Sequence, residues 1–353
     1  MQSFTYTGLP ARVLFGFGTI ASLSEEVSAL GIRKALVLTT PPQASQGKAL
    51  TEQLGSASAG LFSNATMHTP VAVTDEALET YHASGADGVV AIGGGSTIGL
   101  GKAIALRTDC PQLVVPTTYA GSEMTSIIGQ THDGEKTTQK TLKVLPETVI
   151  YDVDFTMSLP PVMSITSGMN AAAHAVEAMY AENANPVLTV MAQEGIRALT
   201  KALPAITQDP ADKSARYDAL YGAWLCAVCL GSGGVALHHK LCHVLGGSFD
   251  LPHAETHTIV LPHALAYNAP AVPETIGKLK AAMGTSDPVG ALFDIAKTGG
   301  APTALKALGM PEEGIDRATQ IAFKNPYYNP RPLEEQPIQA LIRDAWQGIR
   351  PSS

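Results

Sequence analysis

Hydrophobic residues in the first half of the chain predict alternating strands and helices. Continuous apolar runs, typical of strands buried on both faces, lie at 12–17, 34–40, 88–95 and 112–118. Apolar residues at helical spacing, with polar residues between them, lie at 19–31, 77–86 and about 97–106. This alternation predicts a mostly parallel sheet with right-handed crossovers.

The pattern changes near residue 160, at the sequence SLPP (158–161). Beyond it, Ala, Leu and Met at helical spacing predict helices near 166–183, 186–204, 212–231, 234–248 and 256–269. A proline-rich tail (324–337) precedes a final helix. We therefore expect an α/β domain over 1–160 and an all-α domain over 161–353.

Composition and charge exclude several classes of protein. The 353 residues are 45% hydrophobic and 15% charged, which is typical of a globular protein. The formal net charge of -8 disfavours binding to nucleic acid or to an anionic membrane. No signal-peptide pattern and no apolar run of about 18 residues is visible, so we expect a soluble, cytoplasmic protein.

The four cysteines are too few for a disulfide scaffold. Cys226 and Cys229 form a CxxC pair without a second Cys/His pair at ribbon spacing. We interpret them as buried helix thiols, with a redox or metal role as the open alternative.

A glycine-rich loop follows the predicted strand at 88–95. Gly93, Gly94 and Gly95 end the strand, and Ser96 and Thr97 open a helix. Glycines let a phosphate approach the backbone, and a helix N-terminus carries partial positive charge, so the loop suits a pyrophosphate. It is neither a Walker loop nor a GxGxxG fingerprint, and a simple tight turn is the alternative.

A second polar loop, PTTYAGSEMT (116–125), follows the next predicted strand. It offers the hydroxyls of Thr117, Thr118 and Tyr119. Ligands of open α/β sheets bind at the carboxyl ends of strands, so two such loops on neighbouring strands favour a binding site.

Histidines are concentrated in the second half, where six of the ten lie within 238–263. His239 and His243 are four residues apart on a predicted helix and share a face. His253 begins the next segment, and Asn170, His174 and Glu177 share a face of an earlier helix. A lone histidine is usually structural, but several buried imidazoles on Ala-rich helices need polar partners or a ligand. We expect supporting or structural roles for His257 and His263, and we expect His238 to face away from His239.

Together these features resemble the iron-containing, group III alcohol dehydrogenase superfamily, which includes the dehydroquinate synthase and glycerol dehydrogenase folds. The resemblance runs from LFGFGTIASL (14–23) through YDVDFTMSLPP (151–161) to LPHALAYN (261–268). It implies a nicotinamide dinucleotide on the glycine loop and a metal in the helical domain. The superfamily's ligands, one Asp and three His, fall on Asn170, His174, His239 and His253. A further active-site histidine falls on His243, and a lysine near the nicotinamide ribose falls on Lys140.

Two departures point to a branch of that superfamily. The Asp of the GGGSxxD motif is replaced by Gly99, and the anionic metal ligand is replaced by Asn170. An amide and three neutral imidazoles would hold Fe²⁺ weakly, although Zn²⁺ could still accept the imidazoles. Both departures, together with NPYYNPRP (325–332), resemble the maleylacetate reductase branch. The resemblance implies reduction of maleylacetate to 3-oxoadipate with NADH or NADPH, without a metal, in the breakdown of aromatic compounds.

The implied chemistry suggests roles for individual residues. Hydride addition to the enone of this dicarboxylate places negative charge on the ketone oxygen, which an imidazole N–H could stabilise. We assign this role to His243 first and His253 second, with His174 and His239 lining the pocket.

Three further residues are assigned to the ligands. Asn170 would donate an amide N–H to the substrate, and Arg331 would clamp one of its carboxylates. Thr39 ends the second predicted strand, where no acid is present to select NADH, so NADPH should also be accepted.

The resemblance also implies a homodimer, in which FTYT (4–7) could pair across the interface. A metal-dependent alcohol or polyol dehydrogenase, a lyase of the dehydroquinate synthase type and a non-catalytic binding protein remain alternatives.

Overall fold

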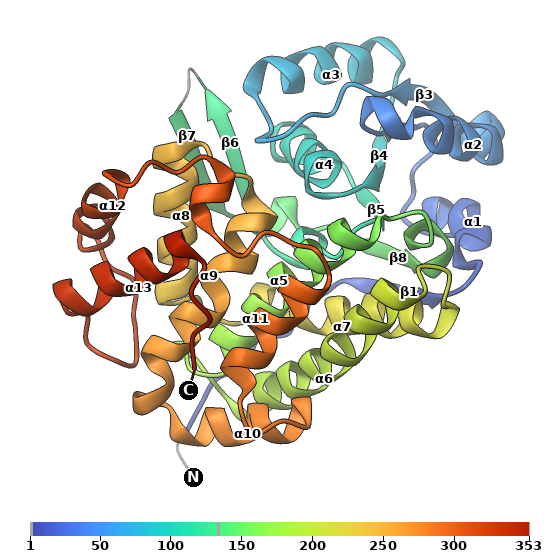
Figure 1. The fold of residues 1–353 in the computed structure, drawn as a ribbon. Helices are drawn as coiled ribbons and strands as arrows, with labels where there is room; N and C mark the ends of the chain where they lie inside the picture. The colour runs from blue at the N-terminus through green and yellow to red at the C-terminus, as the bar shows by residue number, and fades with distance from the viewer. Residues whose placement is uncertain (1–2, 133–134, 353) are drawn as a thin grey trace. The chain divides into compact units, whose positions relative to one another are not determined.

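The computed structural model describes residues 3–132 and 135–352. It divides the chain into two compact units, Gly8–Leu159 and Pro160–Ser353 with Met1–Thr7 (Figure 1). The first unit is α/β and the second is helical, as the hydrophobic pattern predicts. The leading segment groups with the helical unit, whereas the sequence placed it in the first domain.

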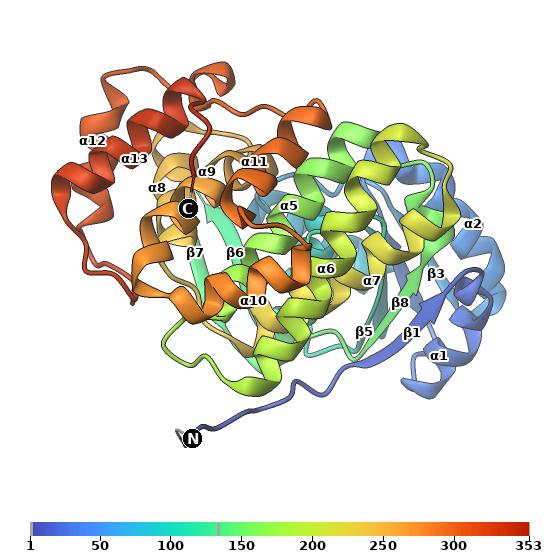
Figure 2. The ribbon, with the colours of Figure 1, turned by 60° about the horizontal axis from the view of Figure 1, so that its bottom comes forward.

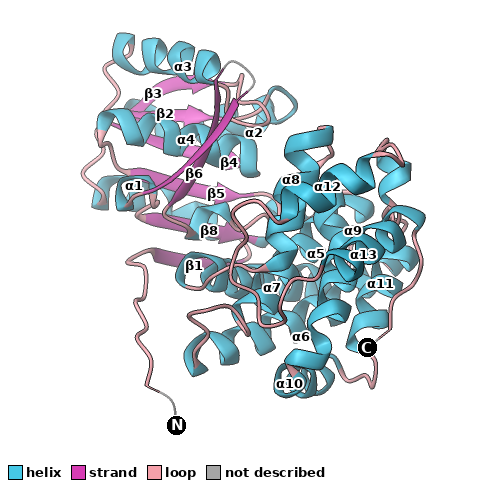
Figure 3. Cartoon of the chain, turned by 90° about the vertical axis from the view of Figure 1, so that its left-hand side faces the viewer, coloured by secondary structure: helices cyan, strands magenta, loops and turns pink. Residues whose placement is uncertain are grey.

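The α/β unit contains a six-stranded parallel sheet. Its strand order is β1-β8-β5-β4-β2-β3, which Figure 3 shows in magenta. The strands are β1 (Arg12–Gly16), β2 (Ala35–Leu38), β3 (Ser58–Phe62), β4 (Gly88–Gly93), β5 (Gln112–Pro116) and β8 (Thr148–Asp152). Its helices are α1 (Leu23–Ala29), α2 (Ala44–Leu54), α3 (Val71–Ala83) and α4 (Gly95–Thr108). The four predicted strands are confirmed, and β3, β8 and α2 are additions.

Alternate residues of the strands build two separate cores. Leu36 and Leu38 of β2 pack with the apolar residues of α3 and α4. Ala35 and Val37 point to the other face, where they pack with α1 and α2. Both faces are therefore buried, which explains why these strands are continuously apolar in the sequence. β8 lies between β1 and β5 (Figure 2).

An antiparallel hairpin follows the parallel strands. It consists of β6 (Ile127–His132) and β7 (Glu135–Lys140), and the sequence did not predict it. The loop before it is held by Lys102 of α4, which donates to Thr125 O at 2.8 Å and to Ile127 O at 2.9 Å. Burial lowers the pKa of Lys102 to about 7. Lys102 thus ties the helix of the glycine loop to the segment that follows β5.

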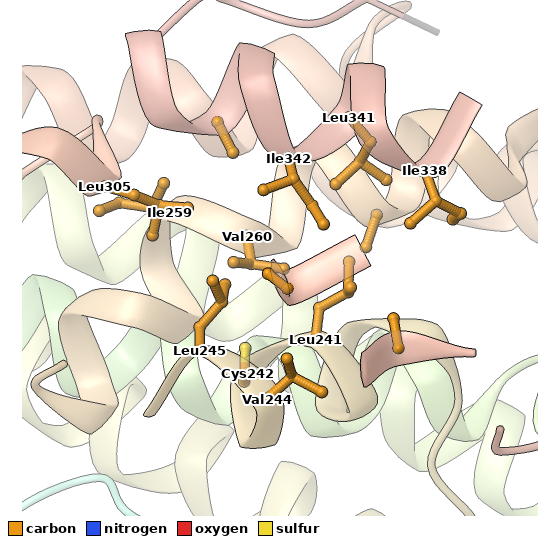
Figure 4. Close-up of a cluster of buried hydrophobic side chains, with 14 of the residues drawn as sticks. Leu241, Cys242, Val244, Leu245, Ile259, Val260, Leu305, Ile338, Leu341 and Ile342 are labelled. Carbon is orange, nitrogen blue, oxygen red and sulfur yellow. The ribbon is translucent and has the colours of Figure 1, made fainter. Parts of the chain in front are cut away.

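The helical unit is built from longer elements. They are α5 (Pro161–Ala178), α6 (Pro186–Gln208), α7 (Lys213–Ser232), α8 (Leu237–Phe249), α9 (His253–Asn268), α10 (Pro273–Met283), α11 (Pro288–Thr298), α12 (Gly314–Ala322) and α13 (Glu335–Gln347). Single turns of 3-10 helix lie at Thr19–Ser22, Pro41–Gln43, Gly55–Ala57, Ser122–Met124, Leu142–Val144, Val153–Thr156, Ala269–Ala271 and Leu305–Leu308. An apolar cluster joins α8, α9, α12 and α13, and Figure 4 shows Leu241, Val260 and Ile342 within it.

No single described helix is long and apolar enough to cross a membrane. α7 and α8 meet that length and composition only as a pair, and they are bent by 92° at their junction.

Candidate active site

The glycine loop turns directly from β4 into α4. A Cβ on Gly93 would collide with Thr97 Oγ1 and would lie 2.9 Å from Gln43 Oε1. A Cβ on Gly94 would lie 3.0 Å from the Thr118 side chain. Position 93 requires glycine, position 94 is tight, and the start of α4 offers its N–H groups and partial positive charge to an anion. The local geometry suits a pyrophosphate.

Hydroxyl groups from two other segments lie around this loop. Thr117 Oγ1 accepts a hydrogen bond of 2.9 Å from Gln43 Nε2, and Thr118 lies against Gly94. Thr39 is fully buried after β2, and its hydroxyl has no hydrogen-bond partner among the described residues. Gln43 is a further polar residue at the loop, which the sequence does not predict because it is a single glutamine outside any motif.

The remaining residues assigned to the cofactor differ in exposure. Tyr119 is fully buried, Ser96 is half-buried, and Lys140 is exposed at the end of β7. Their contacts with a dinucleotide stay predictions.

Gly99, at the position of the superfamily's Asp, is packed against a neighbouring threonine. A Cβ on Gly99 would collide with Thr69 Oγ1. Thr69 is buried and has a φ of 46°, which is unfavourable for a β-branched residue. The space beside α4 that a side chain at position 99 would need is therefore filled by the Thr69 hydroxyl.

Three residues of the helical unit form a buried hydrogen-bonded chain. Glu177, near the end of α5, accepts from His239 Nδ1 at 2.6 Å. His239 Nε2 lies 2.9 Å from His174 Nδ1. The carboxylate also accepts from the backbone N–H groups of Ala236 at 2.7 Å and His238 at 2.6 Å, at the start of α8. Glu177 therefore fixes His239, which in turn fixes His174.

A second group of rings lies against this chain. His238 Nε2 is 2.9 Å from His257 Nδ1, and the His257 ring centroid is 4.3 Å from that of His253. Burial lowers the pKa of His238 and His257 well below its usual range, so both rings are neutral. The expectation that His238 faces away from His239 is wrong, because their ring centroids are 5.1 Å apart. Adjacent helical residues can still meet when both rings turn toward the same buried space.

His243 is exposed and pairs with a tyrosine of the tail. Its Nδ1 lies 3.0 Å from Tyr327 Oη. Burial raises the pKa of Tyr327, with a smaller contribution from Glu177, so the phenol keeps its proton. Tyr327 is not among the functional residues predicted from the sequence, although NPYYNPRP is part of the resemblance to the superfamily branch. The segment's two adjacent aromatic residues were the available signal.

The two residues assigned to the substrate lie in different surroundings. Asn170 is buried on α5, one turn before His174. Arg331 donates to Tyr267 O at 2.9 Å, and its guanidinium lies 4.2 Å from the Tyr267 ring centroid. Arg331 thus anchors the tail to α9, and its role as a carboxylate clamp stays a prediction without support from these contacts. His263 is buried, and burial lowers its pKa to about 4.

The donor set at the superfamily's metal position does not fit iron. His174 Nδ1 and His239 Nε2 lie at hydrogen-bond distance, 2.9 Å. Asn170 supplies a neutral amide where an oxygen-preferring cation needs a carboxylate.

An α/β unit with a glycine loop and a helical unit with clustered histidines together define a class of dinucleotide-dependent oxidoreductase. Residues 10–153 match the family described as iron-containing alcohol dehydrogenase, and residues 164–346 match the description "Fe-containing alcohol dehydrogenase family, C-terminal". The chain belongs to this family, as its sequence predicts.

Individual relatives are similar over their full length. The maleylacetate reductase of Rhizobium sp. (strain MTP-10005) is 54% identical over 351 residues, which cover 99% of this chain and 100% of that protein. The maleylacetate reductase of Pseudomonas knackmussii is 53% identical over 352 residues, 100% of both chains. The crystal structure of maleylacetate reductase from Agrobacterium tumefaciens has a TM-score of 0.96 and 53% identity, covering 99% of this chain and 100% of that one.

Proposed function

We propose that this protein reduces maleylacetate to 3-oxoadipate with NADH or NADPH. The observation that carries the proposal is the hydrogen-bonded chain Glu177–His239–His174 beside Asn170, at the position where the superfamily binds its metal. Such a site offers the Asn170 amide N–H to an anionic substrate, and also an N–H of His174 when His239 holds hydrogens on both nitrogens. The full-length relatives named maleylacetate reductase support the same activity.

The reaction begins with hydride transfer to the conjugated double bond. A reduced dinucleotide, which Gly93, Gly94 and the start of α4 would hold by its pyrophosphate, would supply this hydride to the carbon beta to the ketone. The alkene electrons move toward the carbonyl, so that an enolate forms with negative charge on the ketone oxygen. A proton then adds to the alpha carbon and gives 3-oxoadipate.

The His243–Tyr327 pair suits the stabilisation and protonation steps. Because Tyr327 keeps its proton, its O–H can donate to His243 Nδ1. A neutral His243 then carries its hydrogen on Nε2, which can donate to the enolate oxygen. His253, also exposed, is the second candidate.

The buried chain suits substrate orientation. Glu177 accepts only, so His239 donates through Nδ1, and a proton can lie on either nitrogen of the His239–His174 contact. When His239 is an imidazolium with hydrogens on both nitrogens, it donates to His174 Nδ1, and His174 can present an N–H through its other nitrogen. When both rings are neutral, His174 donates through Nδ1 and its other nitrogen is an acceptor. Asn170 donates an amide N–H where an Asp would repel a dicarboxylate.

The finer features of the proposal concern cofactor, metal, assembly and location. NADPH is accepted as well as NADH, because Thr39 rather than an acid follows β2. Catalysis is metal-independent, since the donor set does not fit iron. The protein works as a homodimer in the cytoplasm, where the reduced cofactor is available.

The proposal is tested by following NADH absorbance with maleylacetate after treatment of the purified protein with a chelator. We expect full turnover at metal contents far below one ion per chain, and comparable kcat with NADPH. Stoichiometric iron or zinc whose removal abolishes turnover would instead support a metal-dependent alcohol or polyol dehydrogenase.

A further inference from the structure

Three side chains beside the histidine cluster form a second group with metal-ligand chemistry. His238 and Cys242 lie one turn apart on α8, and His257 lies on α9; their ligand atoms are all within 4.8 Å of one another. Cys242 Sγ lies 3.6 Å from His238 Nε2, which lies 2.9 Å from His257 Nδ1. None of the three occupies a position of the superfamily's metal ligands, so this group is a different ligand set that adjoins that site, with the His257 ring centroid 4.3 Å from that of His253.

The group is buried. His238, Cys242 and His257 are 0%, 4% and 1% exposed. Cys242 also packs among the apolar side chains of Figure 4, near Leu245 and Val244. Burial raises the pKa of the Cys242 thiol, which therefore keeps its proton until a metal displaces it.

The distances approach those of a thiolate–imidazole site. Bonds of about 2.3 Å to sulfur and about 2.0 Å to nitrogen place the two ligand atoms about 3.5 Å apart. The Cys242–His238 contact of 3.6 Å matches that spacing, and the His238–His257 contact of 2.9 Å needs to open by roughly 0.5 Å.

Charge decides which ion suits this site. One thiolate and two neutral imidazoles carry a single negative charge, and soft sulfur ligands favour Cu⁺. A monovalent ion leaves the buried site with no net charge, whereas Zn²⁺ leaves it positive, which burial disfavours. We propose that His238, Cys242 and His257 form a buried binding site for Cu⁺.

Cu⁺ binding conserves atoms and charge without any electron transfer. The S–H bond of Cys242 breaks as the Cu–S bond forms, and one proton leaves to solvent. The hydrogen between the two imidazoles moves to the far nitrogen of its own ring, so both lone pairs can bind the ion. Those far nitrogens, His238 Nδ1 and His257 Nε2, have no hydrogen-bond partner among the described residues and can take it.

Copper retention tests the site without turnover, so the outcome is independent of the proposed reaction. The full-length protein is stripped, loaded anaerobically with one equivalent of Cu⁺, and titrated with a chromogenic Cu⁺ chelator. We expect Cys242→Ser to release copper at chelator concentrations at least 100-fold lower than the wild type. Cys229→Ser, which changes a buried thiol on α7, should match the wild type. Equal retention by Cys242→Ser would overturn the site and assign the copper to other ligands.

X-ray absorption at the copper edge of the loaded wild type tests the ligands even if Cys242→Ser misfolds. One sulfur and two nitrogen neighbours are expected, and a shell without sulfur would overturn the proposal. Equimolar Zn²⁺ should leave the copper in place, and displacement by zinc would contradict the choice of Cu⁺.

Discussion

The glycine loop of the α/β unit and the histidine cluster of the helical unit are built in different ways. The loop is a backbone structure: Gly93 is required because Thr97 and Gln43 occupy the space of any Cβ there, and Gly94 lies close against Thr118. The histidine cluster is a side-chain structure, in which Glu177 fixes His239 and His239 fixes His174. A backbone site tolerates few substitutions but is insensitive to protonation, whereas a side-chain network depends on every proton it holds.

Loss of His243, the exposed hydrogen-bond donor to the enolate, should have the largest effect on activity. His243→Ala is expected to lower kcat by about 10²–10³, the usual range for one oxyanion donor. Tyr327→Phe, which removes the hydroxyl that bonds to His243 Nδ1, should lower kcat by less. Steady-state kinetics with maleylacetate measure both, and His68→Ala in the α/β unit serves as the control. Near wild-type kcat for His243→Ala would remove this residue from the mechanism.

Glu177→Gln tests whether the buried network depends on one carboxylate. The charge that caps α8 and binds His239 is lost, so we expect the free energy of unfolding to fall by about 2–4 kcal/mol. Urea unfolding measures this, and Glu182→Gln, at an exposed position just after α5, should change it by less than about 0.5 kcal/mol. A similar, small change in both variants would show that the network is held by packing alone.

The histidine cluster and the glycine loop should differ in how strongly acid reduces the stability of their units. His263 has its pKa lowered to about 4 in the folded protein, against about 6.5 when unfolded, so the unfolded state binds the proton first as pH falls. Above pH 6.5 His263 is neutral in both states and does not affect the free energy of unfolding. Between pH 6.5 and pH 4 only the unfolded state takes up the proton, so the free energy of unfolding falls. His263→Gln should reduce the loss between pH 7 and pH 5 by roughly 2 kcal/mol.

Chemical denaturation at the two pH values measures this difference. His82→Gln, at an exposed position of α3, should leave the pH dependence as it is in the wild type. If His263→Gln and the wild type lose equal stability between those pH values, other groups cause the acid sensitivity.

The smallest expected effect is a steric one in the α/β unit. Gly99→Ala places a Cβ against Thr69 Oγ1 and should cost about 1–2 kcal/mol of stability. Thr69→Ala in the same chain removes that hydroxyl, so the double variant should recover most of the loss. Thermal unfolding of the two single variants and the double variant measures the coupling. Additive effects would mean that the two side chains do not compete for the same space.

The same contrast explains what could be predicted from the sequence. β4 and the glycine loop depend on local backbone requirements, so the residue types of this segment predict both the strand and the turn. The hairpin β6–β7 and Gln43 were missed, because polar strands and single polar residues carry no periodic signal. In the histidine cluster the residue types were predictable. The partners Glu177–His239 and His243–Tyr327 were not, since they are separated by 62 and 84 residues and are brought together only by packing.

The pairing of β1 has a consequence for how the α/β unit forms. β1 is at one edge of the sheet and pairs only with β8, the last strand of the unit to be synthesised. During translation β1 emerges first, and it has no partner strand until nearly the whole unit, including β8, has left the ribosome. Its apolar residues stay exposed until then. Closing so long a loop slows folding, so fragments that end before β8 should be substrates for chaperones or proteases rather than partly folded domains.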